Sequence, residues 1–199
     1  MLGSLHVLLV VLVVAAGYAE GQKYSGPNAL GPVRIDKNVP MKSLFERLGR
    51  PSPTTGDVFC YQSQGDQEFV TLTRMVAEYD AKVVGTVTLS SFRNCIKQTV
   101  QPTSDDLAAW KTESAIGLSS TADDVRKAYG KPSREDMIEG NKYRWVIHGD
   151  LINNHYTAAK RPELGEKVLV YQGAPDDLRI AEFGIREGKV AWISLSTNE

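Results

Sequence analysis

The chain carries one short pattern twice. An isoleucine precedes an amphipathic stretch that ends in glycine, a cation and proline, as Gly49-Arg50-Pro51 in the first copy and Gly130-Lys131-Pro132 in the second. The isoleucines of the two copies, Ile35 and Ile116, and their glycines both lie 81 positions apart (116 − 35 and 130 − 49). Self-similarity at a fixed offset is typical of two copies of one structural unit. The sequence therefore predicts a tandem architecture.

Each copy predicts a short helix followed by strands. Residues 40–48 and 121–129 place apolar side chains on one helical face. Gly49 and Gly130 are expected to end these helices, since glycine suits the position after a helix and the proline that follows prevents another turn. Runs typical of strands follow at 58–63, 68–79 and 82–92 in the first copy and at 142–148, 167–171, 178–186 and 190–196 in the second. Glu187-Gly188 predicts a tight hairpin turn between the last two.

This order of elements predicts an α+β fold rather than a parallel α/β sheet. We expect two tandem modules, residues 33–95 and 115–199, each a short helix or helix pair packed on an antiparallel sheet of three to four strands. Residues 96–114 are expected to form a linker with a short helix, anchored by Trp110. Modules this small bury little of their surface alone, so we expect them to pack together or to be stabilised by a disulfide.

The N-terminus predicts export. Residues 5–16 form a nearly unbroken apolar run, which is shorter than the roughly 20 residues that span a bilayer. Gly17 and Ala19 suit positions −3 and −1 of a cleavage site. We expect residues 1–19 to be a signal peptide, residues 20–32 to be a flexible leader, and the mature chain to be periplasmic or secreted without a stable membrane span. Retention of the apolar run as a membrane anchor is the alternative.

The two cysteines, Cys60 and Cys95, are predicted to form a disulfide in an oxidising compartment. In a simple meander they would lie about two strand spacings apart, at about 4.8 Å per spacing, whereas a disulfide needs Cα atoms within roughly 7 Å. The bridge therefore requires a strand end or a strand order other than a meander. Free thiols are the third possibility.

The sequence offers no catalytic constellation. A net charge of −1 gives no basic field for nucleic acid. No Gly-x-Ser-x-Gly turn is present, and Gly130-Lys131-Pro132-Ser133 lacks the upstream glycine of a phosphate-binding loop. We therefore expect a non-enzymatic protein without a cofactor.

Two groups of residues are candidates for binding. His148, Asp150 and His155 lie within eight positions and could hold a metal or small ligand, although their spacing matches no zinc pattern and a polar turn explains them as well. Aromatic residues are frequent in binding hot spots but equally in cores. A possible interaction surface consists of Tyr143, Trp145, Tyr156, Tyr171 and Trp192, together with the loop 149–165.

The second copy resembles a known family. Ile116-Gly117-Leu118, Tyr129-Gly130-Lys131-Pro132-Ser133 and Glu187-Gly188-Lys189-Val190 are similar to the family of the small outer-membrane assembly lipoprotein (BamE/SmpA type) and the β-lactamase inhibitor protein. The resemblance implies a tandem helix-plus-sheet fold and action by protein–protein contact. The first copy lacks glycine after Ile35, no cysteine is placed for lipidation, and the cysteines differ from those of the inhibitor. We expect a protein-binding module, an envelope scaffold or inhibitor-like protein, with an unknown partner in the cell envelope or exterior.

Overall fold

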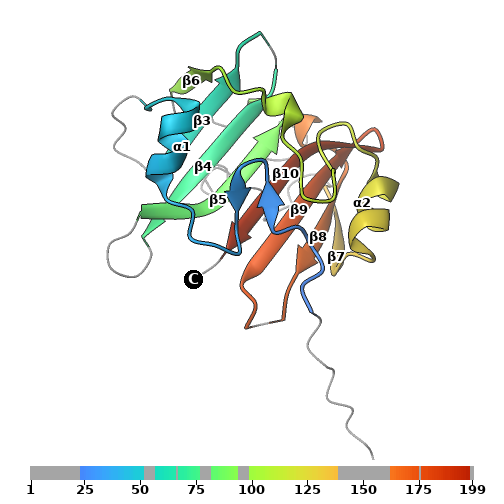
Figure 1. Cartoon of the computed structure of the whole chain (residues 1–199). Helices are drawn as coiled ribbons and strands as arrows, with labels where there is room; N and C mark the ends of the chain where they lie inside the picture. Colours follow the sequence, from blue (N-terminus) through green and yellow to red (C-terminus); the bar gives the residue numbers. More distant parts are fainter. Residues whose placement is uncertain are drawn as a thin grey trace, which may run out of the picture.

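One large sheet organises the molecule. The structure, a computed structural model, describes residues 23–51, 57–65, 67–76, 82–93, 99–138, 162–174 and 176–197. In these residues eight strands pair in the order β6-β3-β4-β5-β10-β9-β8-β7 (Figure 1). Two antiparallel meanders make up most of it: β3 (Val58–Ser63), β4 (Phe69–Val76) and β5 (Lys82–Ser90), then β8 (Lys167–Gln172), β9 (Arg179–Arg186) and β10 (Lys189–Thr197). β5 and β10 pair antiparallel at the centre and join the meanders.

Four short strands were not predicted from the sequence. β6 (Val100–Thr103) runs parallel to β3 at one edge, and β7 (Arg134–Met137) pairs antiparallel with β8 at the other. A separate two-stranded sheet consists of β1 (Ala29–Leu30) and β2 (Val33–Arg34). These strands have two to four residues, which is too short to show a period-two pattern.

The prediction of two α+β modules, each with a small sheet of its own, is wrong. The described residues contain two α-helices, α1 (Met41–Leu48) and α2 (Ala122–Tyr129), and a single mixed sheet of eight strands. One hydrophobic core continues beneath both helices. The physical reason lies in β5 and β10, which would each expose unpaired backbone groups at the edge of a small sheet. Their pairing satisfies both edges.

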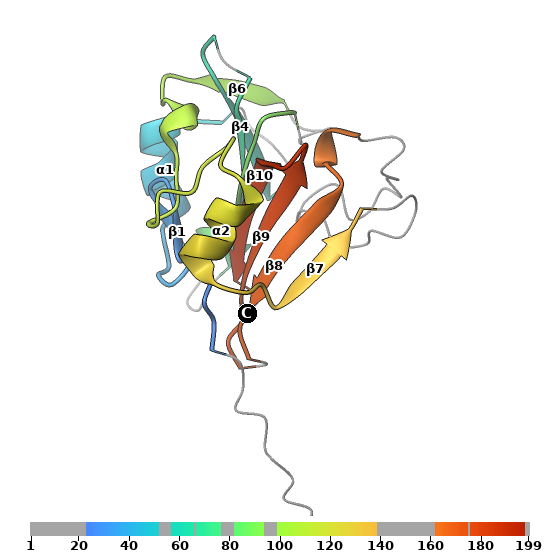
Figure 2. The ribbon, with the colours of Figure 1, turned by 90° about the vertical axis from the view of Figure 1, so that its right-hand side faces the viewer.

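Both helices lie on the same face of the sheet (Figure 2). Each is fixed to its meander by the same two contacts. Tyr61 Oη donates to the carbonyl of Gly49 (3.0 Å), and Tyr171 Oη donates to that of Gly130 (3.1 Å). The amide of Val84 donates to the residue before the α1 cap, Val39 (3.0 Å), and Val190 donates in the same way to Ser120 (2.8 Å).

The predicted helix stops and hairpin are confirmed. Gly49 and Gly130 follow their helices with φ of 102° and 76°, a conformation that disfavours other residues. Glu187 and Gly188 have φ of 52° and 74°, as a tight hairpin turn of the primed type requires.

The segment predicted as a flexible leader is packed where the structure describes it, from residue 23 onward. Leu30 is fully buried, and Tyr24 lies against Arg179, whose guanidinium carbon is 4.7 Å from the ring centroid. The carboxylate of Glu113 accepts hydrogen bonds from the backbone amides of Asn28 (2.7 Å) and Ala29 (3.1 Å). Trp110 is buried, as predicted for the anchor of the linker. The leader prediction is therefore wrong for these residues.

Candidate functional site

Most of the predicted site residues lie outside the described residues. This applies to the metal candidates His148, Asp150 and His155, to the strand predicted at 142–148, and to three members of the aromatic surface, Tyr143, Trp145 and Tyr156. Within the described ranges, no group of three or more His, Cys, Asp and Glu side chains could hold a metal ion. In the same ranges, no helix has the length and apolar character needed to cross a bilayer.

Tyr171 and Trp192 are core residues, so the predicted interaction surface is wrong for these two. Both are fully buried. Tyr171 faces the helices, and burial raises its pKa to about 12. Trp192 lies on the opposite face, where its Nε1 donates to the carbonyl of Leu164 (3.0 Å). Its indole lies directly over Gly184, so there is no room for a Cβ atom at that position.

Cys60 is buried in β3 with its Sγ 3.7 Å from Thr71 Oγ1. It is not a free thiol. Strands β3, β4 and β5 form the expected meander. Strand β6 then pairs with the outer edge of β3 and places Val100 opposite Cys60. Val100 follows Cys95 by five positions, so this strand order removes the geometric objection to the bridge. Cys95 lies outside the described residues, and the Cys60–Cys95 disulfide stays a prediction.

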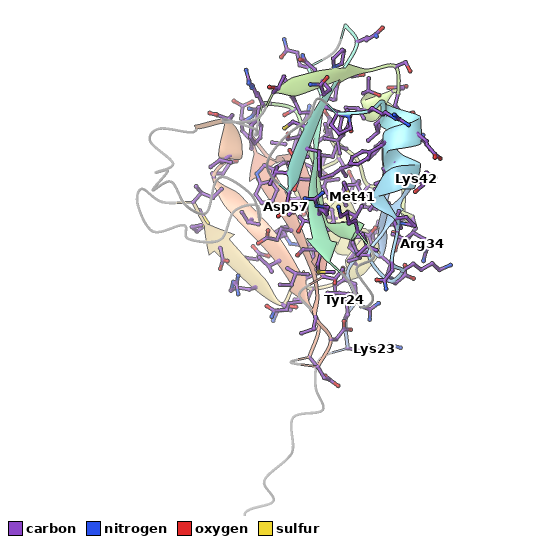
Figure 3. All side chains as sticks on the ribbon, turned by 90° about the vertical axis from the view of Figure 1, so that its left-hand side faces the viewer. Lys23, Tyr24, Arg34, Met41, Lys42 and Asp57 are labelled. Carbon is purple, nitrogen blue, oxygen red and sulfur yellow. The ribbon has the colours of Figure 1, made fainter. Side chains whose placement is uncertain are left out.

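A cavity of about 710 Å³ lies between α1 and the β4–β5 hairpin. We call it the α1 groove. Its floor is apolar and consists of Pro40, Met41, Phe45 and Val83. Met41 and Val83 are each 2% exposed, and the ring of Phe45 packs edge-on against Phe59 with centroids 4.9 Å apart. Figure 3 shows Met41 and Lys42 on the side of the molecule that carries this groove.

The rim of the α1 groove is strongly cationic. Among the described residues, four cations, Lys42, Arg50, Arg74 and Lys82, line it with one carboxylate, Glu46. This concentration of positive charge contrasts with the net charge of −1 of the whole chain. A partner with acidic groups is therefore complementary to the groove.

Two of these cations have partners. Arg74 donates from Nε to Asp57 (2.7 Å) and lies 5.8 Å from the centroid of the Phe59 ring. The Nζ atom of Lys42 lies 4.0 Å from Oε1 of Glu46. This ion pair is exposed and contributes little to stability. Arg50 and Lys82 are exposed and form no ion pair with any described residue. No carboxylate of a described residue therefore neutralises the charge of either side chain.

The start of α1 adds to the positive potential. Its N-cap residue is Pro40, which makes no side-chain cap, and the first turn contains no acidic residue. Neither the cap residue nor the first turn of α1 therefore compensates the positive end of the helix dipole.

The sequence does not reveal the α1 groove, because the residues that line it come from separate segments of the chain. In the sequence, Met41 and Phe45 are recognisable only as part of an apolar helical stripe. One indication was available: α1 begins with Pro40 and Lys42 and lacks the acidic residues that precede the second helix.

Comparison of the chain with protein-family models, with curated proteins and with solved structures finds no match.

Proposed function

We propose that the chain is an exported, non-enzymatic protein that binds another protein at the α1 groove. The observation that carries this proposal is the apolar floor ringed by cations, two of which have no ionic partner among the described residues. Concave apolar sites with a few polar groups are the usual form of binding sites. Arginine and aromatic side chains, here Arg50, Arg74 and Phe45, are enriched in protein interfaces.

The resemblance to the assembly lipoprotein and inhibitor family supports the same proposal, since the known relatives act by protein contact. The matching contacts of Tyr61 and Tyr171 with the ends of their helices agree with an origin of the two halves from one repeated unit. The N-terminal apolar run supports export to the periplasm or the exterior.

A photo-crosslinking experiment tests the proposal. The amino acid p-benzoylphenylalanine replaces Lys42 at the groove or, as control, Lys127 on α2, in the full chain and in the cells that produce it. Both lysines are exposed helix residues, so the two variants lose the same charge. We expect one discrete protein adduct from position 42, its loss when Phe45→Glu is added, and no such adduct from position 127. Equal adducts from both positions, or none from position 42, would contradict the proposal.

A further inference from the structure

We infer that the α1 groove takes an extended acidic segment of the partner, with an apolar side chain on the floor and carboxylates at the two ends. This inference rests on the proposed function and names the chemistry of its ligand.

The dimensions of the groove suit a short stretch of extended chain. Its lining includes Pro40 and Met41 at the start of α1 and Arg50 and Pro51 just beyond its end. A helix of eight residues is about 12 Å long. An extended chain rises about 3.3 Å per residue, so about four residues cover this length.

The available cations lie at opposite ends of this length. Lys82 begins β5 beside Val83, which pairs with Pro40 at the start of α1. Arg50 follows Gly49 at the other end of the helix. Two carboxylates about four residues apart therefore meet one cation each, and the floor at Met41 and Phe45 lies between them.

The same positions around α2 lack this combination. Lys131 follows Gly130 as Arg50 follows Gly49. Lys189 begins β10 as Lys82 begins β5, and it pairs with the cap residue Thr121 as Val83 pairs with Pro40. The position of Phe45 is taken, 81 residues later, by Arg126. Its guanidinium binds Asp123 (3.1 Å) and Glu135 (2.9 Å), so an ion-paired side chain replaces an apolar floor residue. Lys131 and Lys189 thus provide matched controls for charge reversal.

The test uses a fluorescein-labelled peptide, Glu-Ser-Leu-Ser-Glu, whose two carboxylates and leucine share one face of an extended chain. It is titrated with the full mature chain and followed by fluorescence anisotropy at low salt. We expect a Kd below about 1 mM for the unmodified protein. Arg50→Glu and Lys82→Glu are each expected to raise the Kd about tenfold or more, whereas Lys131→Glu and Lys189→Glu change it less than about twofold. Each pair alters net charge equally, so a difference reports the groove and not the overall field. Thermal melting verifies that every variant is folded.

Three results would overturn the inference: no binding of the acidic peptide, equal binding of a peptide with Gln in place of Glu, or equal losses in groove and control variants. If the photo-adduct at position 42 forms while the acidic peptide fails, the inference falls and the proposed function stands. If neither forms, both fall.

Discussion

The two helices end alike and begin differently. After each, a glycine carbonyl accepts a hydrogen bond from a strand tyrosine. At the start of α2, Thr121 and Asp124 form a capping box, in which each side chain accepts from the other residue's amide (3.1 and 2.9 Å). At the start of α1, Pro40 provides no such cap. The first turn of α2 is therefore capped by its own side chains, whereas the first turn of α1 is not.

The opposite face of the sheet shows a second difference. In the α2 half it carries an apolar cluster around Trp192 and Val168. In the α1 half the same face presents buried hydroxyl groups, among them Thr71, Thr86 and Thr88. Only the α2 half therefore has a hydrophobic core on both faces among the described residues.

The largest expected effect tests this second core. Trp192→Ala should lower the free energy of unfolding by about 3–5 kcal/mol, because it removes a fully buried side chain. Thr86→Ala is the control, since Thr86 and Trp192 occupy matching positions. Each lies two residues beyond the valine, Val84 or Val190, whose amide donates to the residue before the helix cap. We expect a loss of about 1 kcal/mol there. Urea denaturation measures both, and equal losses would remove the proposed difference between the two halves.

The next effect concerns Glu182, which lies on this face of the α2 half between Val170 and Ser194. Burial raises the pKa of its carboxyl from 4.5 to about 8, Asp136 raises it further and Arg134 opposes the shift. Between pH 4.5 and 8, the carboxyl of Glu182 is protonated in the folded protein and ionised in the unfolded chain. The free energy of unfolding is therefore highest below pH about 4.5 and falls as the pH rises toward 8.

Glu182→Gln should remove this pH dependence. The free energy of unfolding of the variant should exceed that of the unmodified protein by about 4 kcal/mol at pH 8 and match it at pH 4. Thermal melting across this range measures the difference. A constant difference at all pH values would show that folding does not shift the pKa of Glu182.

The two tyrosine contacts at the helix ends should contribute equally to the free energy of unfolding. Tyr61→Phe and Tyr171→Phe each remove one hydroxyl that donates to a glycine carbonyl, at 3.0 and 3.1 Å. Each should lower the free energy of unfolding by about 1 kcal/mol, and the double variant by about 2 kcal/mol. Strongly unequal losses in urea denaturation would contradict the equivalence of the two halves.

The smallest effects test the two helix starts. Thr121→Ala should cost about 1 kcal/mol because it destroys the capping box of α2. Pro40→Ser should gain up to about 0.5 kcal/mol, since it supplies a side-chain cap that α1 lacks. Loss of stability in Pro40→Ser would mean that Pro40 contributes more through its pairing with Val83 than a cap would add.

Local patterns predicted much of the fold. Both helices, their glycine stops and the strands of the two meanders follow from short-range periodicity and turn chemistry. The joining of β5 to β10 did not, because strand-edge pairing depends on residues about 100 positions apart. Tyr171 and Trp192 suggested a surface because Trp and Tyr are frequent in binding hot spots. Both faces of the sheet are covered at these positions, so both side chains are buried.

The central claim is that the α1 half is the binding side, and amide NMR of the ¹⁵N-labelled mature protein tests it most directly. On titration with Glu-Ser-Leu-Ser-Glu, we expect saturable shifts in the amides of α1 and of strands β4 and β5, with those of α2 unchanged. Equal shifts in α2, or no shifts in α1, would contradict the account.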